Sequence, residues 1–245
     1  MTNLVILGAT SAIAEQVARL YAKPDQYILL VARNKEALSA IAGDLQVRGA
    51  GKVDTSIYDF SNLEEIDNLV SNISSVMARI DLLLVAYGTL PNQSECEASI
   101  ERTQAEINLN CLSVVSVITG LSQVMVGQGS GTIAVVSSVA GDRGRRSNYI
   151  NGTAKGALTI YLQGLRNALS DKGIHVLTIK PGFVDTPMTT GFKKGLLWAK
   201  PEKVAKDIYT AIHKRKNAIY TPWFWGWIML VIKLIPERIF KKMNL

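Results

Sequence analysis

The first regular structure is predicted from the stretch Leu4-Val5-Ile6-Leu7-Gly8-Ala9-Thr10-Ser11-Ala12-Ile13-Ala14-Glu15, in which four large apolar residues lead through small residues into an amphipathic segment. An uninterrupted apolar run is typical of a parallel strand buried on both faces. A helix that begins directly after such a strand offers free backbone amides to the pyrophosphate of a dinucleotide. We therefore expect a cofactor loop formed by Gly8, Thr10, Ser11, Ala12 and Ile13. The alternative is an ordinary strand-to-helix turn capped by Thr10 or Ser11.

The same alternation of strand and helix continues to the end of the chain. Apolar runs of strand length are Leu4–Leu7, Tyr27–Ala32, Val53–Tyr58, Leu82–Ala86, Thr132–Ser137, His175–Lys180 and Ala218–Thr221. Helical stretches between them include Glu15–Tyr21, Leu63–Met77, Ala98–Val126 and Asn151–Lys172. Strands that alternate with helices predict right-handed βαβ units. We expect an α/β fold with a doubly wound, Rossmann-type, seven-stranded parallel sheet in a single domain.

Arg33 follows the second predicted strand. Folds that select NADH place a carboxylate there for the ribose 2′-hydroxyl, whereas an arginine suits a 2′-phosphate. The sequence therefore favours NADPH over NADH, and a solvated surface arginine is the alternative.

A catalytic pattern follows the fifth predicted strand. Ser138 is followed thirteen residues later by Asn151, and Lys155 comes four residues after that. With this pattern the chain resembles the short-chain dehydrogenase/reductase family, whose proton-transfer set is a Ser, a Tyr and a Lys at that spacing. The resemblance covers nearly the whole chain, through Gly8–Ala14, Asp59, Asn108-Leu109-Asn110, Gly131–Gly141, Lys155 and Pro181–Met188.

The resemblance implies a role for each matching residue. Ser138 would hydrogen-bond the substrate carbonyl, Lys155 would hold the nicotinamide ribose and lower the pKa of the proton donor, and Asn108 would order a relay water. Cofactor contacts are implied for Asp59 and Phe60 at the adenine, for Ala86 and Gly88 after the fourth strand, and for Pro181, Gly182, Val184 and Thr186 beside the nicotinamide. Asp59 could instead be a helix cap. Val85-Ala86-Tyr87-Gly88 replaces the family's Asn-Asn-Ala-Gly, so the side-chain bracing of that strand is lost.

Asn151 occupies the position of the proton donor, and an amide cannot release a proton near neutral pH. Tyr149 lies six residues before Lys155, so the two do not share a helix face as residues four apart do. We treat Tyr149 as a pocket or packing aromatic. Three interpretations of Asn151 stay open: an inactivating substitution in a reductase, a variant that uses Ser138, water or Tyr149 as donor, and a protein that binds nucleotide without turnover.

Two segments point to the substrate. Arg143, Arg145 and Arg146 lie between Ser138 and the catalytic helix, where guanidinium groups suit a phosphate; a solvated loop paired with Asp142 is the alternative. We divide the chain into a reductase domain, residues 1–222, and an apolar and basic extension, residues 223–245. Residues 223–242 are rich in Trp and have flanking Lys and Arg, as in an interfacial membrane anchor or a buried subunit interface. Through these segments the chain is similar to bacterial reductases near decaprenylphosphoryl-2-keto-ribose reductase, which implies a lipid-linked keto-sugar substrate.

Composition limits the other possibilities. The 245 residues carry a net charge of +7 with 48% hydrophobic residues, which predicts a globular fold and an anionic partner. No basic run is interleaved with aromatics, so nucleic acid is not expected. Cys96 and Cys111 are expected to be reduced thiols, and the start of the chain reads as a strand, which favours the cytoplasm, including the inner face of the membrane. No metal site is expected, and the resemblance implies a homodimer or homotetramer; a reductase of a soluble ketone or 3-oxoacyl thioester is the alternative activity.

Overall fold

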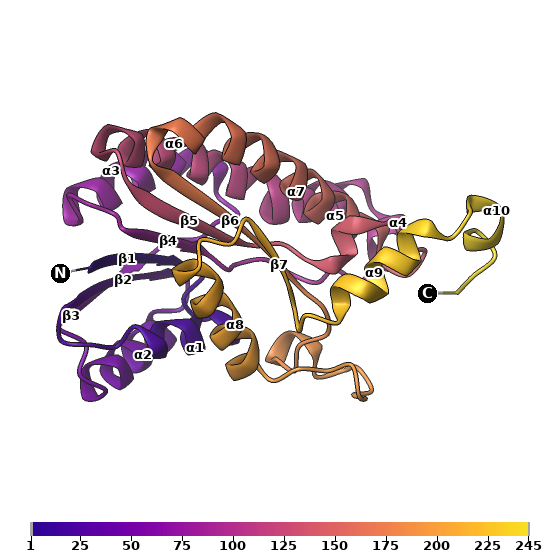
Figure 1. The fold of residues 1–245 in the computed structure, drawn as a ribbon, viewed down its shortest axis with the longest axis horizontal. Coiled ribbons are helices and arrows are strands. Elements are labelled where there is room, and N and C mark those ends of the chain that lie inside the picture. Colours follow the sequence, from indigo (N-terminus) through magenta and orange to yellow (C-terminus); the bar gives the residue numbers. More distant parts are fainter. Residues whose placement is uncertain (1, 245) are drawn as a thin grey trace.

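The computed structural model describes residues 2–244 and contains one seven-stranded parallel sheet, as predicted. The strands follow the order β3-β2-β1-β4-β5-β6-β7 across the sheet (Figure 1). Their bounds are Thr2–Leu7 (β1), Gln26–Ala32 (β2), Lys52–Ile57 (β3), Leu82–Val85 (β4), Gly131–Val136 (β5), Ile174–Pro181 (β6) and Ala218–Thr221 (β7). The prediction of a doubly wound Rossmann-type sheet is confirmed.

Helices cover both faces of the sheet, which is why the central strands are apolar along their whole length. On one face lie α1 (Ala12–Leu20), α2 (Lys35–Val47) and α8 (Pro201–His213). On the other lie α3 (Ile66–Val76), α6 (Ser113–Gln128) and α7 (Tyr149–Leu169) (Figure 1). Alternate residues of β1 enter the two cores, Leu4 and Ile6 on the α1 side and Val5 and Leu7 on the α6 side.

The predicted helix Ala98–Val126 is more complex than its sequence indicates. A short helix α4 (Gln93–Ala98) ends before Ser99, whose hydroxyl caps α5 (Ile100–Ile107) by accepting a hydrogen bond from the Arg102 amide. Residues Asn108–Leu112 then form a π-helical turn before α6. The combined helix Ile100–Gln128 is long and apolar enough to cross a membrane, but half of its most apolar window is buried inside the protein. It packs as a core helix.

Short helical turns and two further helices complete the described chain. The turns are η1 (Leu63–Glu65), η3 (Val139–Asp142), η4 (Ser170–Lys172) and η5 (Pro187–Thr189). Beyond β7 come α9 (Trp225–Leu234) and α10 (Glu237–Phe240), which extend away from the sheet beside η3 (Figure 1). The strand order reverses between β1 and β4, and ligands of such sheets bind outside the carboxyl ends of the strands at this point.

Candidate functional site

A cavity of about 710 Å³ lies at the carboxyl ends of β1, β4, β5 and β6. It brings together most of the residues that the sequence singled out. The predicted residues that line it are Gly8, Thr10, Ser11, Ala12, Ile13, Arg33, Asp59, Phe60, Ala86, Gly88, Ser138, Arg145, Asn151, Lys155, Pro181, Gly182, Val184 and Thr186. Four predicted site residues are not among its lining: Asn108, Arg143, Arg146 and Tyr149.

The turn between β1 and α1 leaves room for an anion. Gly8 has a φ of +79°, and a Cβ at this position would lie 2.6 Å from the backbone nitrogen of Tyr87, so only glycine fits. Ser11 is the N-cap of α1, but its side chain makes no capping hydrogen bond, so it does not act as the cap that the alternative interpretation required. The first backbone amides of α1 therefore remain available to a pyrophosphate. These residues fit a dinucleotide.

Arg33 and Asp59 stand together at the edge of the cavity, both exposed. The Asp59 carboxylate accepts hydrogen bonds from the backbone amide and the hydroxyl of Ser61, at 3.0 and 2.8 Å. These bonds, and to a smaller degree the charge of Arg33, lower the pKa of Asp59. Asp59 is thus a turn cap that also faces the cavity, whereas the Arg33 guanidinium is placed to meet a phosphate.

Tyr87 braces the end of β4, a role that could not be predicted from the sequence. Its ring stacks on Phe60 with centroids 3.8 Å apart and planes 8° from parallel. Its hydroxyl lies 3.0 Å from that of Ser113 on α6. Tyr87 therefore compensates for the absence of the family's two asparagines, because its side chain connects Phe60 in the cavity wall with helix α6.

Ser138 and Lys155 are held by contacts between the end of β5 and α7. The Ser137 hydroxyl donates to the carbonyl of Lys155 at 3.0 Å and lies 2.9 Å from the hydroxyl of Thr159. A Cβ on Gly141 would lie 2.6 Å from the Lys155 carbonyl carbon, so glycine lets η3 pack directly against α7. Ser138 accepts a hydrogen bond from the Ala140 amide at 3.1 Å, which leaves its own proton free to donate to a carbonyl oxygen.

Lys155 is buried beside Asn151, one helical turn away on α7. Burial in the protein lowers the pKa of the Lys155 ammonium to about 8, and the nearby Cys111 thiol opposes this shift. The Nζ atom lies 3.5 Å from the Val136 carbonyl. Asn151 is 6% exposed and lines the cavity, so the structure places an amide at the position where the family places its phenol.

A second buried amide near Lys155 belongs to Asn110, and not to the predicted Asn108. A Cβ on Gly88 would lie 2.6 Å from the Asn110 Oδ1 and 3.3 Å from the Lys155 Nζ, so both atoms flank the Gly88 backbone. Asn110 accepts from the Thr89 amide at 2.9 Å and donates to the Glu106 carbonyl at 3.1 Å. Asn108 is half-buried at the start of the π-helical turn, outside the cavity lining. The π turn shifts the helix register, which the sequence could not show.

The three arginines after Ser138 separate into different environments. Arg145 lines the cavity, burial lowers the pKa of its guanidinium, and its buried Nε has no hydrogen-bond partner within residues 2–244. The prediction that Arg143 binds substrate is wrong, because this side chain donates to the carbonyls of Ile232 and Ile235 at the end of α9. Arg146 is exposed and lies outside the cavity lining, so its role at the substrate stays a prediction.

Tyr149 also lies away from the cavity. It is the first residue of α7 and is 41% exposed. Partial desolvation and the neighbouring Glu97 carboxylate raise the pKa of its hydroxyl, which makes it a poorer acid. The predicted pocket contact is therefore wrong: at the first turn of the helix, the side chain points to α4 instead of toward Lys155.

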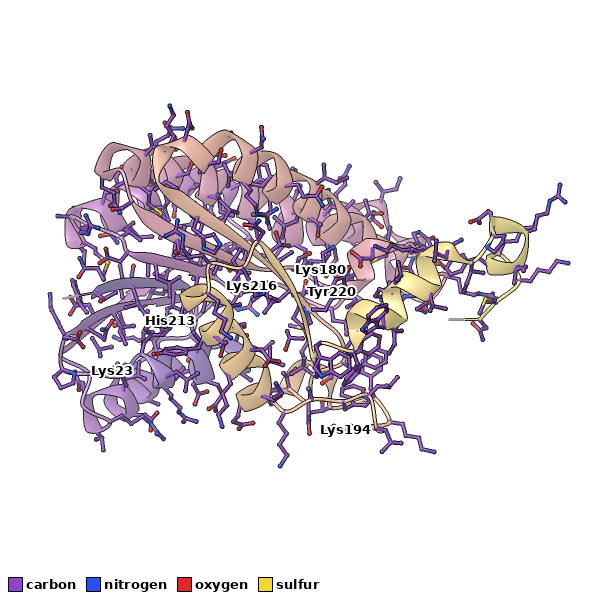
Figure 2. All side chains as sticks on the ribbon, viewed as in Figure 1. Lys23, Lys180, Lys194, His213, Lys216 and Tyr220 are labelled. Atoms are coloured by element: carbon purple, nitrogen blue, oxygen red, sulfur yellow. The ribbon has the colours of Figure 1, made fainter. Side chains whose placement is uncertain are left out.

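A buried ion pair, which the sequence did not indicate, supports the part of the cavity wall formed by η3 and the loop after β6. We call this part of the wall the substrate side. Lys180 and Asp142 lie 2.6 Å apart with side chains 10% and 4% exposed. The Tyr220 hydroxyl donates to the second Asp142 oxygen at 2.6 Å, and Figure 2 shows Lys180 and Tyr220 side by side. Burial, followed by this bond to Asp142, raises the pKa of Tyr220. The pair joins β6 and β7 to η3, the turn that follows Ser138.

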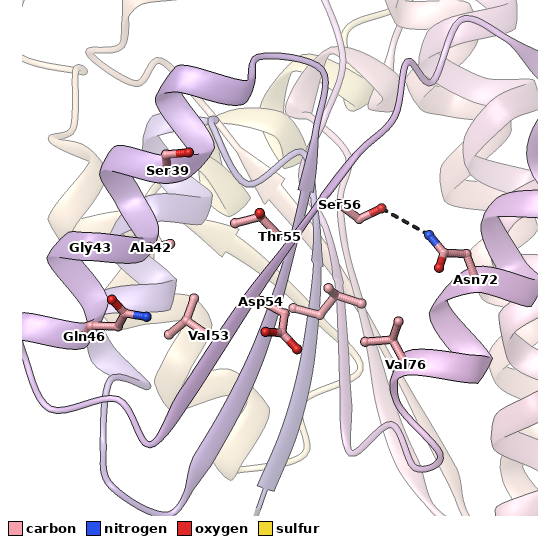
Figure 3. Close-up of a pocket in the computed structure, with 11 residues that line it drawn as sticks. Ser39, Ala42, Gly43, Gln46, Val53, Asp54, Thr55, Ser56, Asn72 and Val76 are labelled. Atoms are coloured by element: carbon pink, nitrogen blue, oxygen red, sulfur yellow. Dashed lines mark hydrogen bonds between the residues drawn. The ribbon is translucent and has the colours of Figure 1, made fainter.

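A second cavity, of about 560 Å³, lies between α2, β3 and α3 at the edge of the sheet (Figure 3). Its one charged lining residue is Asp54, which is already bound by the Tyr27 hydroxyl at 2.6 Å and by Lys52 at 2.9 Å. The Ser56 hydroxyl accepts a hydrogen bond from the Asn72 amide across the cavity (Figure 3). Its one carboxylate is already paired, and none of the site residues predicted from the sequence lines it, so we assign the functional site to the larger cavity.

Comparison with known sequences identifies relatives of the whole chain. The family model described as short chain dehydrogenase matches residues 2–196. An uncharacterized oxidoreductase of Mycobacterium tuberculosis is 32% identical over 240 residues, which covers 98% of this chain and 96% of the relative. Another uncharacterized oxidoreductase, from Streptomyces coelicolor, is 30% identical over 246 residues, with 98% and 95% covered.

Solved structures share the fold at lower identity. A short-chain dehydrogenase from Sphingobium yanoikuyae in complex with NADPH has a TM-score of 0.85 at 21% identity, covering 100% of this chain and 97% of that one. L-sorbose reductase from Gluconobacter frateurii complexed with NADPH and L-sorbose has a TM-score of 0.79 at 24% identity, covering 89% and 94%.

Proposed function

The chain belongs to the short-chain dehydrogenase/reductase family, and from that premise we propose that it binds NADPH and reduces a carbonyl to an alcohol at a low rate. The family is one of NAD(P)-dependent oxidoreductases. The observation that carries the proposal is the joint placement of Ser138, Asn151 and Lys155 in the cavity that also contains the anion-binding turn at Gly8.

NADPH is proposed over NADH because Arg33, an exposed cation, is the side chain at the end of β2 that faces the cavity. The first turn of α1 would hold the pyrophosphate, and the loop from Pro181 to Thr186 would lie beside the nicotinamide. The bound cofactor supplies the hydride that reaches the carbonyl carbon. This hydride would carry both electrons of the reduction, and a proton must still reach the former carbonyl oxygen.

The protein's own residues would orient the carbonyl but supply that proton poorly. The Ser138 hydroxyl is free to donate a hydrogen bond to the oxygen. Asn151 can donate a hydrogen bond but cannot transfer its proton to an alkoxide near neutral pH. General acid catalysis by a positioned side chain raises a rate roughly 10²–10⁴-fold, so the reduction should be slower by this factor than with a positioned general acid.

We propose a keto-sugar that carries a phosphate, linked to a polyprenyl lipid, as the substrate class. Arg145 supports the phosphate, because it lines the cavity and its buried Nε has no hydrogen-bond partner within the described residues. Apolar side chains at the same end of the cavity, Met188, Phe192 and Trp198, support a lipid-linked group. A soluble ketone or a 3-oxoacyl thioester remains the second candidate.

The test is Asn151→Tyr, with Asn151→Phe as a size-matched control without an ionisable group. NADPH oxidation is measured with D-ribulose 5-phosphate, D-fructose 6-phosphate, the two unphosphorylated sugars and acetoacetyl-coenzyme A. We expect kcat to rise roughly 10²–10⁴-fold in the tyrosine variant alone, and more with a phosphorylated sugar. NADPH binding without a gain in turnover on any carbonyl would instead favour a nucleotide-binding protein with no reductase activity.

A further inference from the structure

The last long helix of the chain, α9, is apolar around its whole circumference. Trp225 and Met229 are 3% and 1% exposed and pack with Val139 of η3. The opposite face exposes Trp227, Leu230, Val231 and Leu234, by 65%, 42%, 63% and 72%, and their spacing places them in one stripe along the helix. Trp223, in the turn that leads into the helix, is 69% exposed. We call these five residues the α9 face.

The α9 face is continuous with a loop at the mouth of the cavity. Residues 188–197 expose Met188, Phe192 and Leu196 by 53%, 55% and 103%. The Phe183 ring joins the two segments, because it stacks on Trp198 with centroids 5.3 Å apart and meets Trp225 edge-on at 5.0 Å. Figure 2 shows the loop, marked by Lys194, directly below α9.

The helix α9 is fixed to two loops that border the cavity, the loop after β6 and the loop after Ser138. Trp225 fills the space beside Gly182, where a Cβ would lie 2.0 Å from its indole. Arg143 of the loop after Ser138 donates to the Ile235 carbonyl at 2.7 Å and to Glu237 at 3.0 Å, and its guanidinium lies 3.6 Å from the Phe240 ring centroid. The exposed aromatics therefore belong to a preformed surface rather than to a loose tail.

Cations surround this apolar surface. Exposed Lys233 lies in the last turn of α9, exposed Arg238, Lys241 and Lys242 follow the helix, and Lys193 lies on the loop of residues 188–197. The one acidic residue of residues 223–242, Glu237, is already paired with Arg143. Contact with a second copy through a two-fold axis would bring two such sets of cations together without acids to match them.

We propose that the α9 face and residues 188–197 form a docking surface for an anionic lipid bilayer. Tryptophans that lie at the polar boundary, a shallow apolar face and flanking lysines are the features that bind a bilayer in its interfacial plane. At ten residues α9 is too short to span the hydrocarbon region. Docking in this orientation sets the cavity mouth at the membrane, since Met188 and Phe192 belong both to the docking surface and to the cavity lining. The inference goes beyond the proposed reductase activity and does not rest on it.

The test is co-sedimentation of the full-length protein with vesicles of phosphatidylcholine alone or mixed equally with phosphatidylglycerol. We expect binding to the mixed vesicles that weakens with added salt. Trp227→Glu should lower the partition coefficient at least tenfold, whereas Val47→Glu should leave it unchanged, because Val47 is 90% exposed at the far end of α2. NADPH binding should be the same in all three proteins, which separates a failure here from a failure of the proposed function.

Intrinsic fluorescence gives a second readout, because Trp223 and Trp227, two of the four tryptophans, are exposed at this surface. Their emission should shift to shorter wavelength with the mixed vesicles, and brominated lipid should quench it. Vesicle binding that survives Trp227→Glu would overturn the proposal. Absence of vesicle binding by the parent protein would overturn it too. If the parent protein were in addition an oligomer that Trp227→Glu dissociates, the surface would be an interface between two copies of the chain.

Discussion

The two sides of the main cavity are built in different ways. The cofactor side consists of strand ends and the first turn of a helix, with Gly8, Arg33 and Phe60 fixed by the sheet. The substrate side consists of η3 and the loop after β6, and it is supported from behind by a buried ion pair and by the hydrogen bonds of Arg143 to carbonyls at the end of α9. Backbone geometry therefore positions the first side, whereas side-chain contacts between distant segments position the second. Substitutions should affect stability most on the substrate side and ligand binding most on the cofactor side.

The largest effect on stability is expected from Lys180→Met. Removal of one partner leaves the Asp142 charge buried, which costs about 3–5 kcal/mol of the free energy of unfolding at neutral pH. Urea unfolding measures this change. Lys172→Met breaks an exposed pair with Asp171 and should cost no more than about 1 kcal/mol. Equal losses in the two variants would show that the substrate side does not depend on its buried charges.

Lys155, where the two sides meet, should make stability depend on pH. Burial lowers its pKa in the folded protein to about 8, from the ordinary lysine value of 10.5. Between these values the unfolded chain binds more protons, so the penalty is complete below pH 8 and disappears as the pH rises through 10.5. Lys155→Met removes this penalty at every pH. The free energy of unfolding of the variant minus that of the parent protein should therefore fall by about 2 kcal/mol between pH 7 and pH 9.5. A difference that is constant with pH would contradict this placement of the ammonium.

A smaller effect is expected from Gly8→Ala on the cofactor side. A φ of +79° costs a residue with a Cβ about 1–2 kcal/mol, and the contact with Tyr87 adds to this. The variant should unfold at lower urea concentration and bind NADPH more weakly. Gly43→Ala lies within α2 with open space around its Cβ, so it should stabilise the protein by about 0.5–1 kcal/mol. Parallel behaviour of the two variants would remove the case for a special turn at Gly8.

The smallest effect is expected from Arg33→Ala. The variant should bind NADPH about tenfold more weakly, which corresponds to about 1.4 kcal/mol, and NADH equally well. Fluorescence titration of the two cofactors measures both affinities, with no change in the urea midpoint expected because Arg33 is exposed. Equal losses for NADPH and NADH would show that Arg33 does not read the 2′-phosphate.

Two arginines only two positions apart show the limit of prediction from sequence. Arg143 and Arg145 have the same chemistry in one loop, and both were predicted to bind a substrate phosphate. The structure directs Arg143 to the carbonyls of α9, a helix about 90 residues later, and directs Arg145 to the cavity. Local sequence carries no information about a partner that arrives from so far along the chain.

Asn108 and Asn110 make the same point within one helix. The sequence assigns a site role to Asn108, and regular helical geometry gives no reason to choose Asn110 instead. In the structure the π-helical turn at Asn108–Leu112 buries Asn110 beside Gly88 and leaves Asn108 outside the cavity lining. The seven strands, by contrast, were predicted within two residues at each end, because a strand covered on both faces must be apolar along its length.

The sequence by itself determined the doubly wound parallel sheet of seven strands, the resemblance to the family and the absence of a phenol at position 151, since each depends on local pattern or fixed spacing. Only the tertiary structure decided which charged side chains face the cavity and which are consumed in packing. It alone revealed the Lys180–Asp142 pair, the brace at Tyr87 and the continuity of the α9 face with the cavity mouth. These features join segments that are far apart in the chain, and burial and hydrogen bonding across such distances are set by packing, not by the residues next to them.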